Sequence, residues 1–407
     1  MPAKRILYCE SNADGTIGGS FFSLLFLIQG LDRERYEPVV IFYKDNSLIP
    51  SYRASGIDTR VLEKPLPWNF VRSLASAGGI RALCSRLLWP VQKALNVGRF
   101  LLMPVADKYL YLKRNHIDLV HLNNSIIRNN DWMIAARLAG IPCLTHERGI
   151  NAHYPQLSRW LAPRLDAVIC ISNAVANNLR SKAIPDKNFQ IIFNGLDPAN
   201  VVADETDSEI RARYGIALSD PVTGMVGNIK EWKGQKSVVL AIARVKQHFP
   251  DIRCFLVGDT ADADQPYRDV LEQLIEEHGL QKNIIFTGYQ TNVANFVSTM
   301  DVVIHSSVLP EPFGRVLIEA MALKKPLVGA RDGAVPEIVL EGETGFTFEP
   351  DNPDEMSACI VSLLQNPDQA KTMGGKGYQR LNEHFSIGSN VEKTRLLYDE
   401  ILARRSS

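Results

Sequence analysis

Two glutamates flank a Pro-Phe-Gly loop in the segment from Glu311 to Glu319. An apolar run that ends at His305 precedes this loop, and the apolar periodicity after it predicts a helix that begins near Gly314. The N–H groups and the positive dipole end at the start of such a helix suit a diphosphate. Glu319 can then accept hydrogen bonds from ribose hydroxyls, and Glu311 from sugar hydroxyls. The alternative is a loop charge and a solvated helix residue, but the apolar surroundings of Glu319 favour ligand binding.

A lysine follows another apolar run, in the Trp-Lys-Gly turn that contains Lys233. A leaving nucleoside diphosphate gains negative charge as its bond to the sugar stretches, and a fixed ammonium group stabilises that charge. The alternative is an exposed lysine without a role, which is the commonest state of this residue type. The position of Lys233 directly after a strand that ends in Gly227-Asn228 favours the catalytic role.

His146 follows the apolar run 141–145, and therefore lies at the carboxyl end of a predicted strand. Ligands of open parallel sheets bind at that edge, although a lone histidine is more often a structural group. Arg148, two residues later, is a candidate acceptor contact. The pair Gly18-Gly19 lacks the spacing of a dinucleotide fingerprint; it either closes a strand-to-helix turn or lets donor phosphate or acceptor approach backbone N–H groups.

The only Asp-x-Asp pair of the sequence, Asp262 and Asp264, follows a polar loop and no strand end. A pair that holds Mg²⁺ on a diphosphate is expected at a strand end. We therefore expect no metal site and no cofactor, with a nucleotide-diphosphate sugar as substrate.

The elements that position these residues follow from the pattern of the chain, in which short apolar runs are separated by amphipathic stretches. Such an alternation is typical of parallel sheets covered by helices on both faces. The sequence thus predicts an α/β protein with two Rossmann-like domains. The expected strands of the first are 5–9, 37–43, 119–122, 142–146, 167–171 and 189–193, and those of the second are 222–226, 253–257, 283–287, 302–305, 326–329 and 345–348.

The polar stretch 198–207 sets the boundary between the two domains. We expect an acceptor-side domain at 1–197 and a nucleotide-sugar-binding domain at 198–384. The segment 385–407 is helical in pattern and can pack back on the first domain.

The composition of the chain argues against some classes of protein and indicates where the protein is located. The 407 residues include 45 basic and 45 acidic side chains, which argues against a protein that coats nucleic acid. The scattered cysteines, the polar residues soon after the N-terminus and the lack of an apolar run of ~18 residues point to a cytoplasmic protein.

The segment from Glu311 to Glu319 resembles the signature of family-4 retaining glycosyltransferases, which have the GT-B fold of two Rossmann-like domains that face each other across a cleft. The resemblance extends in order over nearly the whole chain. Its other segments are Gly18-Gly19, His121, Thr145-His146-Glu147, Ser172–Val175, Phe193–Asp197, Gly227–Gly234, Val257–Asp259, Phe286–Gly288 and Asp332–Glu337.

This resemblance implies roles for residues of both domains. The catalytic residues are His146, Lys233 and Glu311, and the acceptor-side residues are Gly18, His121 and Arg148. Donor-binding residues are Gly19, Asn228, Lys233, Gly288, Glu311, Phe313, Gly314, Arg315, Val316 and Glu319. The family usually has arginine at the position of Asn228, and Arg315 is a candidate to replace that charge. The mechanism implied is metal-independent front-face attack, in which a leaving phosphate oxygen helps to deprotonate the acceptor.

Residues 63–114 carry nine basic and two acidic side chains, interleaved with aromatic and aliphatic ones. A basic amphipathic helix of this kind can lie in a membrane interface, and ordinary helices that cover the first sheet are the alternative. Membrane contact would place the protein at the inner face of the cytoplasmic membrane.

We therefore expect a glycosyltransferase that acts on a saccharide or lipid-linked acceptor in the synthesis of a cell-surface polysaccharide or glycolipid. Two alternatives remain open. One is a GT-B-fold sugar-nucleotide epimerase, which Lys233 and the glutamate pair disfavour. The other is an inactive donor-binding subunit, for which Asn228 is the only hint.

Overall fold

The computed structural model describes residues 2–12, 18–62, 88–93 and 95–404, which form two compact units. One comprises the chain up to 170, residues 176–191 and the chain from 393 onward, and the other comprises residues 171–175 and 192–392. Residues 63–87 of the predicted basic segment lie outside the described residues. No helix in the described part of the chain is long and apolar enough to cross a membrane.

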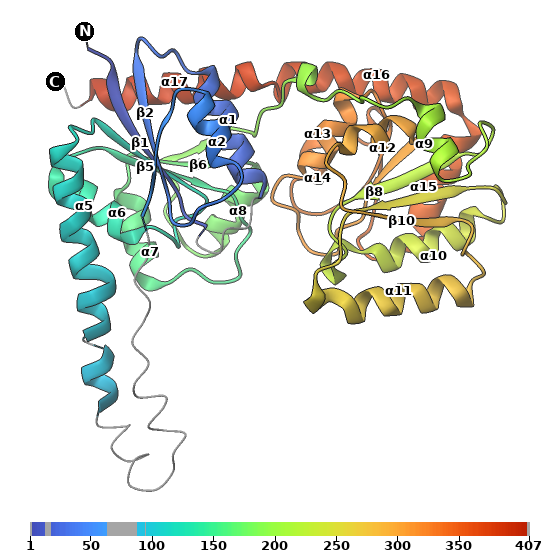
Figure 1. Ribbon diagram of the computed structural model, residues 1–407, viewed down its shortest axis with the longest axis horizontal. Coiled ribbons are helices and arrows are strands. Elements are labelled where there is room, and N and C mark those ends of the chain that lie inside the picture. The colour runs from blue at the N-terminus through green and yellow to red at the C-terminus, as the bar shows by residue number, and fades with distance from the viewer. Residues whose placement is uncertain (1, 13–17, 63–87, 94, 405–407) are drawn as a thin grey trace, which may run out of the picture. The chain divides into compact units, whose positions relative to one another are not determined.

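The first unit is built on a seven-stranded parallel sheet with strand order β3-β2-β1-β4-β5-β6-β7 (Figure 1). The order reverses between β1 and β4, which pair side by side from Ile6 with Leu119 to Glu10 with Asn123. The strands are β1 Lys4–Glu10, β2 Tyr36–Phe42, β3 Asp58–Val61, β4 Leu119–Asn123, β5 Cys143–Glu147, β6 Ala167–Cys170 and β7 Phe189–Ile191.

Helices connect these strands, and α5 and α6 pack side by side (Figure 1). The last helix, α17, reaches β2, where Tyr36 donates a hydrogen bond to Asp399. The helices are α1 Gly19–Gly30, α2 Ile49–Ala54, η1 Gly98–Leu102, α5 Met103–Arg114, α6 Asn130–Ala139, α7 Gln156–Leu161, η2 Ala162–Arg164, α8 Asn173–Ser181 and α17 Ile387–Ala403.

The second unit contains a six-stranded parallel sheet with order β10-β9-β8-β11-β12-β13. Its strands are β8 Val222–Val226, β9 Arg253–Val257, β10 Ile284–Gly288, β11 Val302–His305, β12 Leu327–Ala330 and β13 Gly345–Phe348. Its helices are η3 Pro198–Asn200, α9 Asp207–Arg213, η4 Glu231–Lys233, α10 Gln235–Val245, η5 Asp262–Asp264, α11 Gln265–Glu277, α12 Val293–Thr299, α13 Arg315–Ala322, α14 Val335–Ile338, α15 Pro353–Gln365 and α16 Pro367–His384.

The central strands of both sheets are buried, as their apolar sequences predict. Ile6, Leu7 and Cys9 of β1 are fully buried, and the second core includes Leu256, Ile304 and Val328. Polar residues appear at the carboxyl ends of the first unit's strands, where Glu10, Asn123 and Glu147 are also fully buried. These strand ends are the part of the sheet that can carry chemistry.

One strand was not predicted. β3 lies at the edge of the first sheet and pairs only with β2 among the described strands. Its residues Asp58–Val61 are exposed or half-buried, so the segment needs no apolar run and gave no signal in the sequence.

Candidate functional site

Glu311 is the centre of a polar cluster in the second unit. Its Oε2 accepts hydrogen bonds from Lys233 Nζ at 3.0 Å, from His305 Nε2 at 3.2 Å and from Ser307 Oγ at 3.3 Å. Burial alone would raise the pKa of Glu311, but the hydrogen bonds and charges of His305 and Lys233 outweigh it and lower the pKa to about 2. Glu311 is therefore ionised at neutral pH and holds the ammonium of Lys233 in place.

The backbone of Glu311 is fixed by the segment that follows β12. Its carbonyl oxygen accepts a hydrogen bond from the N–H of Ala334 at 2.8 Å. A Cβ atom at Gly333 would lie 2.3 Å from that same oxygen, and Gly333 has a φ of +58°. Only glycine fits this position without displacing the loop. The Asp332-Gly333-Ala334 segment thus positions the carboxylate from behind.

Lys233 reaches Glu311 because the loop after β8 packs against the end of β11. Ser306 Oγ donates to the carbonyl oxygen of Lys233 at 2.9 Å. Gly234 comes next with a φ of +76°, and a Cβ there would lie 2.0 Å from the carbonyl oxygen of Ser306. The ammonium also lies 4.1 Å from the ring centroid of Trp232. Two segments 78 residues apart are joined by these contacts.

The second glutamate of the signature lies on α13. Gly314 occupies the N-cap position of this helix, and Arg315 NH2 contacts Glu319 Oε1 at 3.1 Å one turn further on. Val316, in the first turn, is half-buried. Each glutamate is therefore paired with a cation, Glu311 with Lys233 and Glu319 with Arg315. Carboxylates and positively charged side chains therefore lie together at the predicted diphosphate-binding segment.

Three further predicted donor-binding residues lie in different surroundings. Phe313 is buried and its ring packs with those of Phe193 and Phe385, at centroid distances of 6.4 and 6.0 Å. Asn228 is exposed, and its carbonyl oxygen accepts from Gln235 at 3.0 Å. Gly288 ends β10 and its carbonyl oxygen accepts from the N–H of Gly258 at 3.1 Å. The ring of Phe313 has a packing role, and ligand contact at these residues stays a prediction.

In the first unit, four aromatic residues form a buried chain of hydrogen bonds. His121 Nε2 lies 2.7 Å from His146 Nδ1, and His121 Nδ1 contacts the hydroxyl of Tyr398 on α17. That hydroxyl donates in turn to the hydroxyl of Tyr8 at 3.2 Å. The chain links the carboxyl end of β5 to the C-terminal helix.

Both histidines of this chain are neutral at physiological pH. Burial lowers the pKa of His121 to about 3 and that of His146 well below its usual value, and the charge of Arg148 acts in the same direction. When Tyr398 donates to Tyr8, His121 Nδ1–H must donate to Tyr398, and His121 Nε2 must accept from His146 Nδ1–H. His146 then presents an unprotonated Nε2, which can accept a hydrogen bond from a hydroxyl group.

Arg148 belongs to a second polar cluster at the same edge. Its Nε donates to Asn123 Oδ1 at 2.8 Å, and Asn123 Nδ2 donates to Glu10 Oε2 at 2.6 Å. Asn123 Nδ2 also lies 3.3 Å from the carbonyl oxygen of Ser20, one residue after Gly19. Arg148 and the start of α1 are thereby tied to one cluster. Gly18 and Gly19 are exposed at that start.

Glu147 fastens the loops after β4 and β5. It accepts from Ser125 Oγ at 2.9 Å, from the N–H of Ile126 at 2.9 Å and from Asn151 Nδ2 at 3.0 Å. Burial raises its pKa to about 8, although these hydrogen bonds act to lower it. Its place beneath both loops indicates a structural role.

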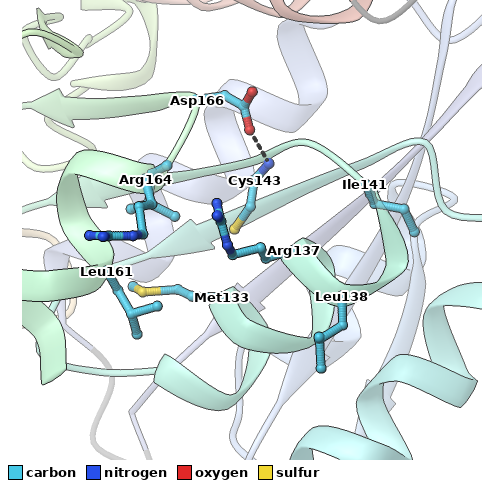
Figure 2. A pocket seen from close by; sticks show the side chains of 9 residues that line it. Met133, Arg137, Leu138, Ile141, Cys143, Leu161, Arg164 and Asp166 are labelled. Carbon is cyan, nitrogen blue, oxygen red and sulfur yellow. Dashed lines mark hydrogen bonds between the residues drawn. The ribbon is translucent and has the colours of Figure 1, made fainter.

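One cavity of the first unit has a volume of about 410 Å³, and none of the residues of these clusters lines it. Figure 2 shows the residues of its wall. Its wall includes Cys143, whose N–H donates to Asp166 Oδ2 at 2.8 Å, together with Arg137 and Arg164 (Figure 2). Cys143 is the first residue of β5 and Asp166 precedes β6. The cavity therefore lies at the amino-terminal edge of the sheet, opposite to His146.

The sequence interpretation missed His305, Glu10, Asn123 and Tyr398. Glu10, Asn123 and His305 lie at the ends of their strands. The reasoning that identified His146 from its place at a strand end could therefore have identified them. Tyr398 gave no signal of this kind, because only the path of α17 brings it to His121.

Two family models match the chain, one on each half. The model described as Glycosyltransferase Family 4 matches residues 17–200, and that of Glycosyl transferases group 1 matches residues 206–380. The chain is 25% identical over 299 residues to N-acetyl-alpha-D-glucosaminyl L-malate synthase of Bacillus anthracis, with 71% of this chain and 76% of that protein covered. It is 23% identical over 247 residues to the lipopolysaccharide core biosynthesis mannosyltransferase LpsB of Rhizobium meliloti, with 60% and 68% covered.

Solved structures share the fold. HepE of Anabaena in complex with UDP aligns with a TM-score of 0.78 at 22% identity, and covers 98% of this chain and 100% of that one. Sucrose-phosphate synthase of Thermosynechococcus elongatus aligns with a TM-score of 0.76 at 19% identity, with 98% and 100% covered. The two Rossmann-like domains of the GT-B fold, predicted from the sequence, are thereby confirmed.

Proposed function

The chain belongs to the family-4 glycosyltransferases, and from that premise we propose that it is a retaining, metal-independent enzyme with a nucleotide-diphosphate sugar as donor. The observation that carries this proposal is the contact of Lys233 with Glu311 at 3.0 Å in a part-buried cluster. A positioned ammonium group next to a sugar-binding carboxylate suits the departure of a nucleoside diphosphate. Relatives support it, since HepE is described in complex with UDP.

In the proposed reaction the acceptor hydroxyl attacks the anomeric carbon from the face that the diphosphate leaves. The bond between that carbon and the phosphate oxygen breaks, its electron pair stays on the oxygen, and the acceptor proton moves to the leaving phosphate. Lys233 stabilises the charge on the phosphate, and Arg315 adds a second cation. Glu311 and the Nε2 of His146 hold hydroxyls of the donor sugar, while Glu319 holds the ribose.

The acceptor in this proposal is a saccharide or a lipid-linked saccharide of a cell-surface polysaccharide or glycolipid. The relative LpsB is a lipopolysaccharide core biosynthesis mannosyltransferase, which supports that substrate class. Gly18, His121 and Arg148 belong to the acceptor side, His121 through its contact with His146.

We extend the proposal to peripheral contact with the cytoplasmic membrane. Large apolar side chains are exposed along residues 88–103, next to the basic Lys93 and Arg99; they are Leu88, Trp89, Val91, Leu95, Val97, Leu102 and Met103. This mixture suits an anionic lipid surface. Co-sedimentation with vesicles that contain phosphatidylglycerol, but not with pure phosphatidylcholine vesicles, is expected. Equal recovery with both would contradict an electrostatic contact.

The enzyme is tested first with a thermal-shift screen of UDP-, GDP- and ADP-sugars, in which the true donor raises the unfolding temperature. The stabilising donor is then incubated in EDTA and followed by NMR. Transfer or slow hydrolysis with retained anomeric configuration is expected. An inverted product or a strict Mg²⁺ requirement would contradict the mechanism. A donor epimerised without acceptor would indicate an epimerase, and binding without turnover an inactive subunit.

A further inference from the structure

A second cavity of about 840 Å³ opens at the carboxyl edge of the first sheet. It is lined by residues that follow four neighbouring strands, Ser11 after β1, Tyr43 after β2, Leu62 after β3 and residues 127–131 after β4. The strand order reverses between β1 and β4. Ligands of open parallel sheets bind at such a reversal, so this cavity has the place of a binding site.

Asn129 forms part of its wall and has an unusual environment. The residue is 5% exposed, has a left-handed φ of 59° and occupies the N-cap position of α6. Its Nδ2 and Oδ1 are buried without a hydrogen-bond partner among the described residues. Asn124, another left-handed residue of the same loop, instead donates to Ser11 Oγ at 2.9 Å. A buried carboxamide without partners is unfavourable unless a ligand or water supplies them.

Tyr111, on α5, also lines the cavity. Its hydroxyl is buried near the charges of Arg60, Asp58 and Arg5, on β3 and β1, so the wall gains its ring. Five charged residues line the cavity, Arg99, Asp107, Lys108, Arg128 and Asp131, and Lys108 Nζ lies 2.8 Å from Asp131 Oδ2 in a largely buried ion pair. Beside these charges the wall offers the carboxamide of Asn129, which both donates and accepts hydrogen bonds.

We propose that this cavity binds a sugar ring of the acceptor through Asn129, an inference that rests on the proposed transferase function. A hydrocarbon chain has no hydrogen-bonding groups for this carboxamide. A sugar ring offers hydroxyls along its edge, and its C–H faces can pack on apolar wall residues such as Phe100 and Leu101.

The cavity is connected to the polar cluster of the strand ends. Ser11 lines it and is the residue next to Glu10, whose carboxylate accepts from Asn123 at 2.6 Å. Asn123 in turn accepts from Arg148 at 2.8 Å. A sugar held by Asn129 would therefore lie beside the edge that presents Arg148 and His146.

The test is saturation-transfer difference NMR on the full chain without donor. The probes are the methyl glycosides of glucose, galactose, mannose and N-acetylglucosamine, with lactose and maltose, and hexane-1,6-diol as an alcohol without a ring. At least one saccharide should give a saturable response, and the diol none. Asn129→Gly keeps the left-handed backbone and removes the carboxamide, so it should weaken that binding roughly five- to tenfold.

The control is His116→Gly, at an exposed left-handed residue of the same unit. It should leave saccharide binding unchanged, and thermal unfolding should show that all variants are folded. Saturable binding that is equally strong in Asn129→Gly, or no saturable binding of any saccharide, would overturn the proposal. Because no donor is used, saccharide binding by a protein without transferase activity would refute the transferase function alone. An active transferase whose acceptor KM is unchanged in Asn129→Gly would refute the cavity alone.

Discussion

His121 Nε2 lies 2.7 Å from His146 Nδ1, and the two imidazole rings stack with 4.7 Å between their centroids. Both rings are buried, so neither can change its protonation cheaply. The hydroxyl of Tyr398 at the other end of His121 therefore decides which nitrogen of His146 carries the proton. Tyr398, on the C-terminal helix α17, thereby determines whether the Nε2 of His146 accepts or donates a hydrogen bond.

Tyr398→Phe should disturb this arrangement. Without the hydroxyl, His121 Nδ1 loses its partner and the Nδ1–H tautomer of His146 is no longer enforced. We expect kcat to fall by about tenfold, in the range seen for a lost hydrogen bond of ~1.4 kcal/mol. The ¹⁵N shifts of His146 should show a mixture of tautomers.

The matched control is Tyr36→Phe, which removes a hydroxyl that bonds Asp399 on the same helix but does not contact the histidines. Its ¹⁵N shifts at His146 should match those of the wild type. If Tyr398→Phe lowers stability but leaves the tautomer of His146 unchanged, the positioning role is wrong.

The histidine pair also predicts a response to acid. The folded-state pKa of His121, about 3, lies below the ordinary value near 6.5, and that of His146 is lowered as well. Below pH ~6.5 the unfolded chain binds protons that the folded chain does not, so this contribution to stability is lost as pH falls. The imidazole resonances of both residues should not titrate between pH 5 and 8. Titration of His121 near pH 6 would show that the ring is not buried in solution.

Glu147 should make the stability of the protein depend on pH in the opposite direction. Its folded-state pKa of about 8 lies above that of an ordinary glutamate, so the folded protein retains a proton that the unfolded chain releases. Stability from this residue therefore falls as pH rises from ~4.5 to 8, by about 1.4 kcal/mol per pH unit at most. In Glu147→Gln, the urea-unfolding midpoint should therefore change less with pH between pH 6.5 and 8. If the midpoint of this variant changes with pH as much as that of the wild type, the hydrogen bonds of Glu147 outweigh its burial and keep the carboxylate ionised.

The fold was predictable because buried parallel strands require unbroken apolar runs. The strands at 222–226, 253–257, 302–305 and 345–348 have the predicted bounds. β3 was missed because an edge strand can be polar, as Asp58–Val61 is. The sequence assigned both Lys233 and Glu311 to the donor site, and the structure brings their side chains within 3.0 Å. Their roles in catalysis stay predictions.

Other parts of the candidate site depend on contacts that no local pattern encodes. His305 contacts Glu311 because the signature loop turns back on its own strand. Tyr398 meets His121 across 277 positions of sequence. The orphan amide of Asn129 is apparent only once the cavity around it is formed. Strand ends can be read from a sequence, whereas partners brought by another element cannot.

Glu319→Ala should act mainly on donor binding. Its proposed contact with ribose hydroxyls exists in both the ground state and the transition state, so the donor KM should rise while kcat changes little. The loss of one charged hydrogen bond suggests a rise of about tenfold or more. Arg315→Ala removes its partner at 3.1 Å. If Arg315 binds the diphosphate, this variant should lower kcat as well, and an effect on KM alone would restrict it to orienting Glu319.

Lys233 and Glu311 allow a test that separates charge pairing from catalysis. Lys233→Met should lower kcat by ~10²-fold or more through loss of the ammonium. It also leaves the Glu311 carboxylate buried with one cation fewer, so unfolding should become easier and the pKa of Glu311 should rise. Adding Glu311→Gln removes that uncompensated charge. The double variant should therefore regain much of the lost stability in urea unfolding, while its kcat stays low. If activity returns together with stability, Lys233 serves only to neutralise Glu311. If neither variant affects turnover, the reaction takes place elsewhere.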